Sequence, residues 1–181
     1  MRKLILAMIF IILIPNIVYA EKHELEELHI HTYIHADGSA TITETRNATL
    51  SKGSENFLVI ENIGESKITD FYVYEYGLPY EFVDGWDSSA SQKDKLLKNG
   101  IIETSKGYEL VWGIGVYGEH EYVLEYKVTD FIKQLNDAQM IYWYFVSDNT
   151  NIPPVDVTIE IESDQPFSYG DEKIWGFGFD G

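Results

Sequence analysis

The segment HIHTYIHADGSATITE concentrates histidines at a spacing that could bind a metal ion. His29, His31 and His35 lie within seven residues, and alternate residues of a strand point to the same face. Two imidazoles on one face can hold zinc or copper when a third ligand comes from elsewhere in the fold. The sequence offers Glu44 and His120 as that third ligand, and spacing places neither of them.

The same histidines are also typical of the polar face of an ordinary β-strand. The residues between them form a mainly aliphatic row that must face a core: Leu28, Ile30, Thr32 and Ile34. A polar outer face requires no third ligand, so we favour it over a metal site. We therefore predict no metal or cofactor site, and we keep weak zinc binding at His29 and His31 as the alternative.

The acidic residues offer a second kind of chemistry, because paired carboxyls can act as general acid and base. A chain with 30 acidic residues contains such pairs by chance, and strand spacing cannot show a cleft. Glu44 shares its face with Ile42 and Arg46, which predicts a partly buried ion pair. The sequence has no nucleophile-elbow, phosphate-loop or zinc-protease motif. We therefore predict no catalytic residue and no enzyme.

Two acidic segments could bind calcium weakly through carboxylate and amide oxygens. The first contains Asp84, Asp87 and Asp94, and the second contains Asp148, Asn149 and Asn151. Neither segment follows the ligand order of an EF-hand loop. Calcium therefore stays an alternative to the prediction that the protein has no cofactor.

Aromatic side chains supply the remaining candidate site, which would bind a ligand rather than react with it. Tyr72, Tyr74 and Tyr76 alternate along one predicted strand, and Tyr80 and Trp86 follow shortly after. A row of exposed rings could stack on sugars or anchor a protein partner, whereas buried rings would belong to the core. We keep Tyr74, Tyr76, Tyr80 and Trp86 as candidate ligand-facing residues.

The elements that must position these residues are strands, because an apolar period of two dominates the chain after residue 20. VDVTIEI and EYVLEYKV each have one polar face, whereas MIYWYFV is apolar on both faces, as a covered central strand would be. Strands are expected near residues 26–35, 39–50, 55–62, 67–76, 78–83, 100–104, 107–113, 121–128, 140–146 and 155–161. Short strands separated by Gly and Pro turns predict an all-β fold, an antiparallel β-sandwich.

Two segments differ from this strand pattern. Asp130–Leu135 is the best candidate for a short helix, and little other helix is expected outside the first 20 residues. Asp84–Gly100 is the longest polar interruption. We predict that it is an exposed excursion and the most mobile part of the domain.

The first residues have the layout of a secretory signal peptide. Arg2 and Lys3 precede an apolar run, and Ala20 provides the small residue of a cleavage site. The run is shorter than the ~20 residues that a membrane-spanning helix needs. We predict a signal peptide over residues 1–20 and an extracytoplasmic domain over residues 21–181, with an uncleaved anchor as the alternative.

Charge and cysteine content narrow the choice of partners. The formal charge of −17 becomes −19 once Arg2 and Lys3 leave with the signal peptide, so nucleic acid and anionic membrane surfaces repel the domain. The chain has no cysteine, which excludes thiol catalysis and thiolate-bound zinc. We expect an unknown protein or envelope ligand as partner, no nucleic acid, and membrane association only through an uncleaved signal segment or a span beyond Gly181.

Five sequence segments in fixed order carry a family resemblance: DGSATITET, GEHEYVLEYKV, MIYWYFV, IPPVDVTIEI and KIWGFGFDG. Together they resemble the extracytoplasmic N-terminal domain of the YciQ-like predicted membrane proteins, a bacterial family of unknown function. The resemblance covers about residues 24–181. It implies an exported β domain that is followed, in full-length relatives, by transmembrane helices and a cytoplasmic tail. It implies no reaction and therefore no catalytic residue.

The sequence as a whole predicts a secreted or envelope-tethered β-sandwich that acts as a non-enzymatic sensing or interaction module. The alternative is a carbohydrate-binding or carbohydrate-cleaving secreted domain. Surface geometry distinguishes the two functions. Exposed aromatic rings beside a cleft with close carboxyls favour sugars, whereas buried rings under a polar surface favour the module.

Overall fold

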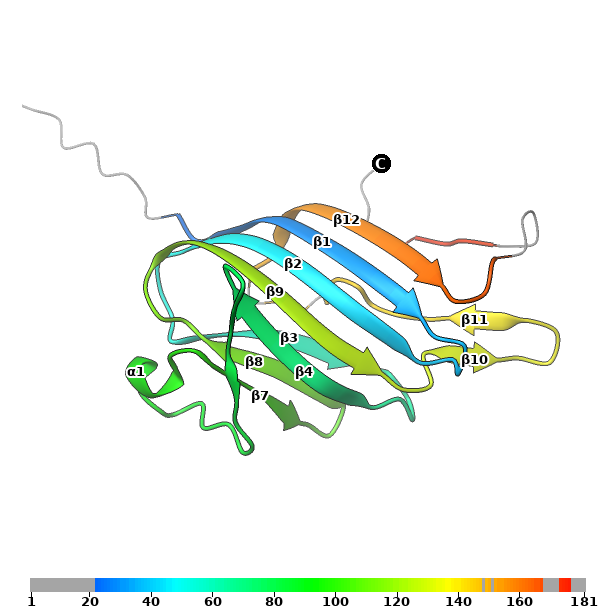
Figure 1. The fold of residues 1–181 in the computed structure, drawn as a ribbon, viewed down its shortest axis with the longest axis horizontal. Helices are drawn as coiled ribbons and strands as arrows, with labels where there is room; N and C mark the ends of the chain where they lie inside the picture. Colours follow the sequence, from blue (N-terminus) through cyan, green and yellow to red (C-terminus); the bar gives the residue numbers. More distant parts are fainter. Residues whose placement is uncertain (1–21, 148, 151, 168–172, 177–181) are drawn as a thin grey trace, which may run out of the picture.

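Two β-sheets packed face to face form the fold, which the computed structural model describes for residues 22–147, 149–150, 152–167 and 173–176 (Figure 1). In spatial order, the first sheet contains β12 (Pro154–Ser163), β1 (Glu24–Ile34), β2 (Ala40–Leu50), β9 (Gly118–Val128), β4 (Ile68–Glu75) and β5 (Leu78–Pro79). The second sheet contains β3 (Glu55–Glu61), β8 (Gly107–Gly113), β7 (Lys98–Glu103) and β6 (Glu81–Phe82). This arrangement confirms the predicted all-β fold, and the predicted signal peptide lies outside the described residues.

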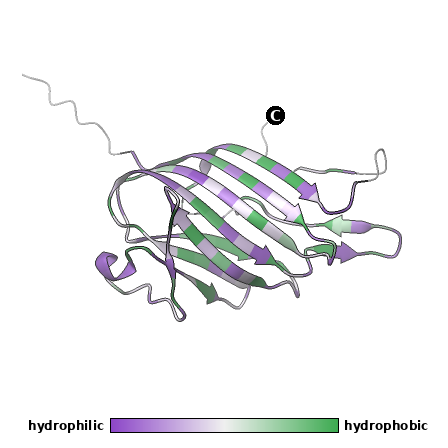
Figure 2. Cartoon of the chain, in the orientation of Figure 1, coloured by the Kyte–Doolittle hydropathy of each residue, from purple (hydrophilic) through white to green (hydrophobic). Residues whose placement is uncertain are grey.

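Period-two alternation sends one row of each main strand into the space between the sheets, and Figure 2 shows the resulting change of hydropathy from residue to residue. In β9 the buried row is Tyr122, Leu124, Tyr126 and Val128, as the sequence predicted. In β1 the buried row is Leu28, Ile30, Thr32 and Ile34. The histidines of β1 therefore occupy the opposite, outer row.

The core lies between the two sheets and draws side chains from both. Ile30, Ile42 and Leu124 of the first sheet are fully buried and belong to the same cluster as Leu110 and Trp112 of the second sheet. Burial of a side chain of this size stabilises the fold by about 1.5–3 kcal/mol. Because the chain has no disulfide, this shared burial is what holds the sheets together.

Two strand pairs differ from the purely antiparallel arrangement that the sequence predicted. β12 runs parallel to β1, with Leu25 opposite Pro154 and Ile34 opposite Ser163, and β6 runs parallel to β7. The long connection from β9 to β12 permits this direction, because it can return the chain to the far end of the sheet as a tight hairpin cannot. Among the described strands, β12 pairs with β1 alone and forms an edge of the first sheet.

The predicted central strand over MIYWYFV is wrong. Only its first residues belong to a strand, β11 (Gln139–Ile141), and the chain then continues without regular structure. Trp143 and Phe145 pack against the core, whereas Tyr142 and Tyr144 are 59% and 51% exposed. The segment is therefore apolar in both rows for two different reasons. The row with Trp143 and Phe145 covers the core, and the row with Tyr142 and Tyr144 exposes aromatic rings.

The predicted helix over Asp130–Leu135 is also wrong. This segment contains β10 (Ile132–Gln134), which pairs with β11 as an antiparallel hairpin. The Ile132 amide also donates to the carbonyl of Gly38 at 3.0 Å, in the turn between β1 and β2. Tertiary pairing therefore overrides the local helix signal. Within the described residues, the α-helix is α1 (Gln92–Lys95).

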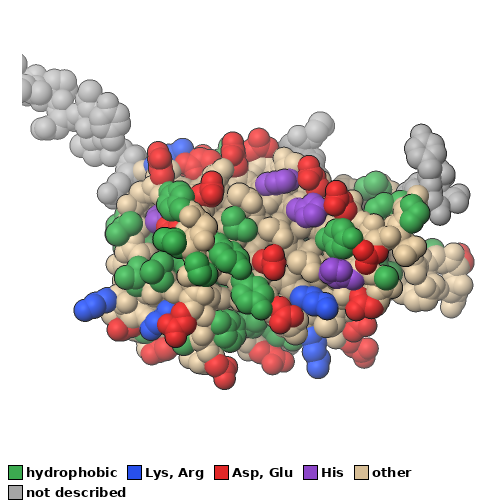
Figure 3. Space-filling model, viewed as in Figure 1, with side chains coloured by type: hydrophobic (Ala, Val, Ile, Leu, Met, Phe, Trp, Pro, Cys, Tyr) green, Lys and Arg blue, Asp and Glu red, His purple; other side chains and the backbone are tan. Residues whose placement is uncertain are grey.

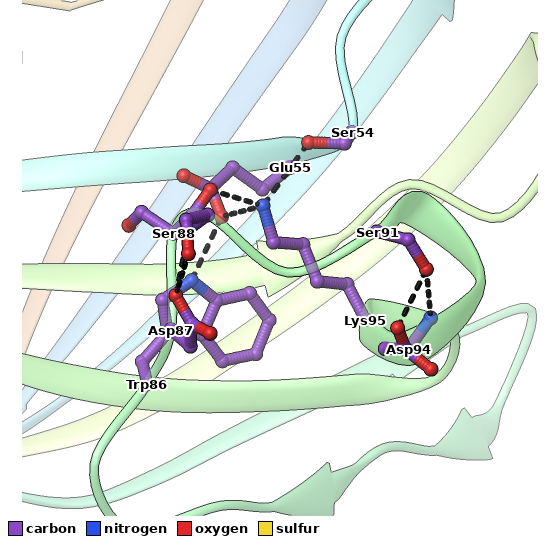
Figure 4. A network of polar contacts seen from close by, with 9 residues as sticks. Ser54, Glu55, Trp86, Asp87, Ser88, Ser91, Asp94 and Lys95 are labelled. Carbon is purple, nitrogen blue, oxygen red and sulfur yellow. Dashed lines mark hydrogen bonds and ion pairs between the residues drawn. The ribbon is translucent and has the colours of Figure 1, made fainter.

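Most residues of the polar segment Asp84–Gly100 are exposed, as predicted, and the segment is fastened to the domain by the buried Lys95 side chain. Figure 4 shows the Lys95 side chain pointing into a polar network. Its Nζ donates to Ser88 O at 2.7 Å and to Ser54 Oγ at 3.1 Å, and it lies 2.9 Å from a Glu55 carboxylate oxygen. The Trp86 indole N–H donates to the same carboxylate oxygen at 2.8 Å. We name these contacts the Lys95 network.

Candidate functional site

The histidines of β1 lie on the outer face of the first sheet beside an acidic row on β12, and Figure 3 shows the histidine side chains bordered by carboxylates. His29 Nε2 is 3.5 Å from Glu160 Oε2, and His31 Nε2 is 3.3 Å from Glu162 Oε2. Glu160 and Glu162 stay more than half exposed. Each imidazole therefore has a carboxylate neighbour from the adjacent strand.

The two side chains that the sequence offered as a third metal ligand lie on the other side of the sheet. Glu44 and His120 face the core and are 1% and 4% exposed, whereas His29 and His31 face outwards. A site that combines them with His29 and His31 is therefore excluded. Among the described residues, no three His, Asp or Glu side chains are placed to share a metal ion.

The end of β12 is tied to the turn between β1 and β2 by one carboxylate. Asp164 accepts a hydrogen bond from the Tyr33 hydroxyl at 2.6 Å and another from the Ala36 N–H at 2.8 Å. These two bonds, the hydroxyl first, hold the pKa of Asp164 below the ordinary aspartate value. β12 is thus anchored along β1 and at its C-terminal end.

A buried ion pair lies beneath the outer face, where the sequence predicted a partly buried one. Arg46 Nη1 donates to Glu44 Oε2 at 2.6 Å, and the Tyr126 hydroxyl donates to the other oxygen of Glu44 at 2.9 Å. The guanidinium also lies 5.7 Å from the ring centre of Trp112, which belongs to the second sheet. Burial, followed by the Glu44 charge, raises the pKa of Tyr126, so its hydroxyl stays a donor.

A second buried polar group joins β4, β9 and the chain after β5. His120 Nδ1 lies 2.6 Å from Glu75 Oε1, and the Tyr80 hydroxyl donates to Glu75 Oε2 at 2.5 Å. Burial, then the hydrogen bond to Glu75, raises the pKa of Tyr80 and keeps it protonated. Sequence reasoning missed this group, because it depends on the register that sets Glu75 opposite Tyr122 and so beside His120.

Both interior groups have the chemistry of structural pairs. Each carboxylate is held by fixed donors between the sheets, and the side chains of Glu44 and Arg46 are only 2% and 9% exposed. A general acid or base must reach a substrate, and these groups face the core instead. The Glu44–Arg46 group sets β2 and β9 against Trp112 of the second sheet, and the Glu75 group joins β4, β9 and the chain after β5.

The predicted ligand-facing aromatic residues separate into two sets. Tyr76 is 62% exposed and Tyr74 is half-buried, so these two remain accessible. Tyr80 is 8% exposed and bonded to Glu75, and the Trp86 ring belongs to the Lys95 network. Burial thus removes Tyr80 from the surface, whereas Trp86 is half-buried and its indole N–H is bonded to Glu55.

A groove of the described surface lies between β3 and the chain that carries residues 142–144, 147 and 149. It has a volume of about 100 Å³ and is lined by Glu61, Asn62, Tyr142, Tyr144 and Asn149 among others. Asn149 Nδ2 donates to a Glu61 carboxylate oxygen at 3.3 Å. The Tyr142 and Tyr144 rings meet edge to face at 5.5 Å.

The groove thus combines aromatic rings with a carboxylate and amides. Sequence reasoning missed it, because MIYWYFV was assigned to a covered strand. The available signal was the second aromatic row of that segment, which a central strand does not require.

The predicted calcium segments do not assemble a described site. Asp87 accepts from the N–H and O–H of Ser89, and Asp94 accepts from the Ser91 hydroxyl at 2.6 Å. These local bonds, the Ser89 hydroxyl first, hold the pKa of Asp87 below the ordinary aspartate value. In the second predicted segment, Asp148 and Asn151 lie outside the described residues.

Comparisons with known proteins give one family match. The family described as "Predicted membrane protein (DUF2207) N-terminal domain" matches residues 24–177. No curated protein matches the chain. Within the described residues, no helix combines the length and the apolar character needed to cross a bilayer.

Solved structures also match the chain. One of those that match is described as a "putative protease" from Parabacteroides distasonis ATCC 8503 and is 18% identical. The match covers 61% of this chain and 24% of that chain, with a TM-score of 0.34. The chain thus spans about a quarter of that protein.

Proposed function

The chain belongs to the family of N-terminal domains of predicted membrane proteins, and we propose from this premise that it is an extracytoplasmic, non-enzymatic binding module of the cell envelope. The family match supports the part of the resemblance that concerns the N-terminal domain of a predicted membrane protein. The proposal adds an exported location, for which the signal-peptide layout of residues 1–20 is the support. It also adds a binding role, for which the support is the surface of the domain.

The observation that carries the proposal is a series of exposed apolar side chains along β4, β5 and β6, which we call the apolar corner and define as Tyr72, Tyr76, Leu78 and Phe82. These residues are 47%, 62%, 64% and 50% exposed. Tyr76 and Leu78 flank Gly77, whose φ of 78° makes the tight turn from β4 to β5. Large apolar side chains at a turn are costly to leave in water and are typical of a contact surface for another protein.

Site-specific photo-cross-linking tests the proposal in the source cells. A benzophenone amino acid replaces Leu78 in the apolar corner, and Lys106 in the turn between β7 and β8 serves as the exposed control position. We expect a covalent adduct with one protein from position 78 and none from position 106. Adding Tyr72→Ser and Phe82→Ser to the position-78 protein should remove most of the adduct.

Two results would overturn the proposed function. Equal cross-linking from positions 78 and 106 would show that the apolar corner is not a specific contact surface. Turnover of glycan or peptide substrates by the purified domain would show that it is an enzyme. Circular dichroism of each variant verifies that the fold is intact.

A carbohydrate-binding role is the second candidate, and the groove beside β3 favours it. Exposed Tyr142 and Tyr144 offer rings for stacking on a sugar face, and Glu61 with Asn149 offers hydrogen-bond partners for hydroxyls. One carboxylate, Glu61, lines the groove among the described residues, whereas most glycoside cleavage uses two. The groove therefore supports sugar binding more than sugar cleavage.

Calorimetric titration with soluble cell-wall oligosaccharides tests this second candidate. If the groove binds sugars, Tyr142→Ala should abolish the heat of binding, and Tyr72→Ala in the apolar corner should leave it unchanged. The absence of any heat with the wild-type domain would exclude the carbohydrate role for the oligosaccharides tested. Equal losses in both variants would place the binding site away from the groove.

A further inference from the structure

The free edge of β12 is the longest strand edge that no other described strand covers. β12 pairs with β1 in one continuous register, from Leu25 opposite Pro154 to Ile34 opposite Ser163, without a bulge. No other described strand pairs with the backbone N–H and C=O groups on its other side, and these groups are spaced as a regular ladder. Such a ladder is a template for an additional strand.

β12 lacks the bulge, the lysine and the inward-pointing charge that protect many sheet edges, and its charged side chains are the acidic ones of its outer row. Its sequence PVDVTIEIES contains no glycine and no lysine, and its one proline is the first residue. No charged side chain points inward from it, because its inner row is Val155, Val157, Ile159 and Ile161. Natural edges carry bulges, prolines, charged side chains, above all lysine, or inward charges that prevent pairing. The acidic outer row disfavours pairing with another acidic strand, and it leaves the ten-residue edge open to a basic one.

The two faces of β12 define what a bound strand must look like. In the inner row Val155 is 68% exposed and Ile161 is 39% exposed, so this row is incompletely covered. The outer row is Asp156, Thr158, Glu160 and Glu162, and all four are exposed. A complementary strand would therefore alternate apolar side chains with basic ones.

We infer that the free edge of β12 binds an extended segment of a partner protein in which Lys or Arg alternates with β-branched residues. Backbone hydrogen bonds supply the added strand, apolar residues extend the inner row, and basic residues meet the acidic outer row. A second copy of this chain fits less well. An antiparallel copy centred on Ile159 would set Asp156 opposite Glu162, and like charges placed opposite each other are destabilising.

This inference rests on the proposed binding function, but it uses a surface separate from the apolar corner. β12 is at one edge of the first sheet, whereas the corner begins on β4 near the other edge. An experiment can therefore reject the proposal for one surface and leave the proposal for the other standing. An adduct at position 78 without strand addition at β12 would reject the inference and leave the proposed function standing.

A synthetic peptide tests the inference directly. The probe is a capped octapeptide that alternates lysine with valine or threonine, titrated at pH 8 into the isotope-labelled domain. One control peptide has glutamate in place of lysine, and another keeps the lysines but carries N-methyl groups on alternate backbone amides. We expect amide shifts concentrated in β12 with the probe, and at least tenfold weaker binding of both controls.

Charge reversal on the domain provides the matched comparison. Glu160→Lys with Glu162→Lys changes the outer row of β12, and Glu119→Lys with Glu121→Lys makes the same charge change on β9 of the same sheet. We expect the β12 pair to weaken binding of the lysine peptide at least tenfold and to improve binding of the glutamate peptide. The β9 pair should change both affinities less than threefold.

Three results would overturn the inference. Equal binding of the N-methylated peptide would show charge attraction without an added strand. Amide shifts concentrated outside β12 would place the site elsewhere. Equal weakening by the two charge-reversed pairs would show that only the net charge matters. Thermal melts of each variant verify that the sheet is intact.

Discussion

The two edges of the first sheet are finished in opposite ways. At the β4 edge, the Tyr80 amide donates to the carbonyl of Val73 at 2.8 Å, and the Asn99 side chain donates to the carbonyl of Phe71 at 3.1 Å. Asp70 interrupts that strand with a φ of 54° and a change of register. At the β12 edge, ten residues run without a bulge and without a further described strand.

Because the two edges differ in this way, substitutions at the β4 edge should affect stability, and substitutions at the β12 edge should affect binding. The β4 edge is closed by groups from the chain that crosses to the second sheet, and the Lys95 network fastens that same connection. Removing those groups breaks buried contacts. The β12 edge carries exposed side chains whose replacement changes few contacts but changes the surface offered to a partner. The closed edge should therefore be sensitive to substitution in folding assays, and the free edge in binding assays.

The largest expected effect is at the Lys95 network. Lys95→Met keeps most of the aliphatic stem but removes the ammonium that holds Glu55 and the carbonyl of Ser88. Leaving buried partners unpaired should lower the free energy of unfolding by about 3 kcal/mol in urea denaturation. Lys93→Met, on the exposed side of α1, should stay within about 0.5 kcal/mol. Equal losses would show that the network does not fasten the segment.

A smaller loss is expected at Tyr80. Tyr80→Phe removes one hydrogen bond to the Glu75 carboxylate and keeps the ring. Hydrogen bonds to charged groups contribute about 1.5–3 kcal/mol, so the unfolding free energy should fall by an amount near the lower end of that range. Tyr72→Phe, on an exposed ring of the same region, should change it by less than about 0.5 kcal/mol. An equal loss of unfolding free energy in Tyr72→Phe and Tyr80→Phe would contradict the role assigned to the hydrogen bond between Tyr80 and Glu75.

At the free edge, a substitution should alter binding with little change in stability. Val155 is 68% exposed, so Val155→Lys should shift the free energy of unfolding by no more than about 0.5 kcal/mol. The inward lysine should nevertheless weaken binding of the lysine octapeptide, because it repels the basic strand and protects the edge. Stability comes from chemical denaturation and affinity from fluorescence polarisation. If Val155→Lys lowers the stability strongly and leaves the affinity for the peptide unchanged, the free edge serves folding and not binding.

The smallest expected effect is a pH dependence shared by both edges. Hydrogen bonds lower the pKa of Asp87 beside the Lys95 network and of Asp164 at the end of β12. Each folded-state pKa is thus below the unfolded value of about 3.9, so the stabilisation is present above that pH and is lost as pH falls through the folded-state value.

Carboxyl-carbon NMR titration checks both pKa values. The stability difference between wild type and Asp87→Asn should shrink in the same acidic range. A folded-state pKa at or above the unfolded value would contradict the hydrogen bonds assigned to that carboxylate.

The sequence was sufficient for most strands, because strict alternation in VDVTIEI and EYVLEYKV specifies both the element and its buried face. It also indicated the Glu44–Arg46 pair, since both residues fall in an inward row. It could not place MIYWYFV, because an aromatic segment that covers a core edge has the same composition as a central strand.

Contacts between distant parts of the chain were not predictable. The Lys95 network joins residues up to 41 apart in the sequence, and the Glu75–His120 contact joins residues 45 apart. Local spacing gives no information about such pairs. The free edge of β12 depends in the same way on the parallel pairing with β1, which only the folded topology reveals.

Hydrogen exchange on the amides of β12, with and without the lysine octapeptide, tests the central claim most directly. The account predicts that amides on the free side of β12 exchange fast in the isolated domain and become protected on peptide addition. Those of β4 should keep the same rates, and the N-methylated peptide should protect neither strand. Peptide-dependent protection at β4, or unchanged exchange at β12 with the peptide bound, would contradict the account.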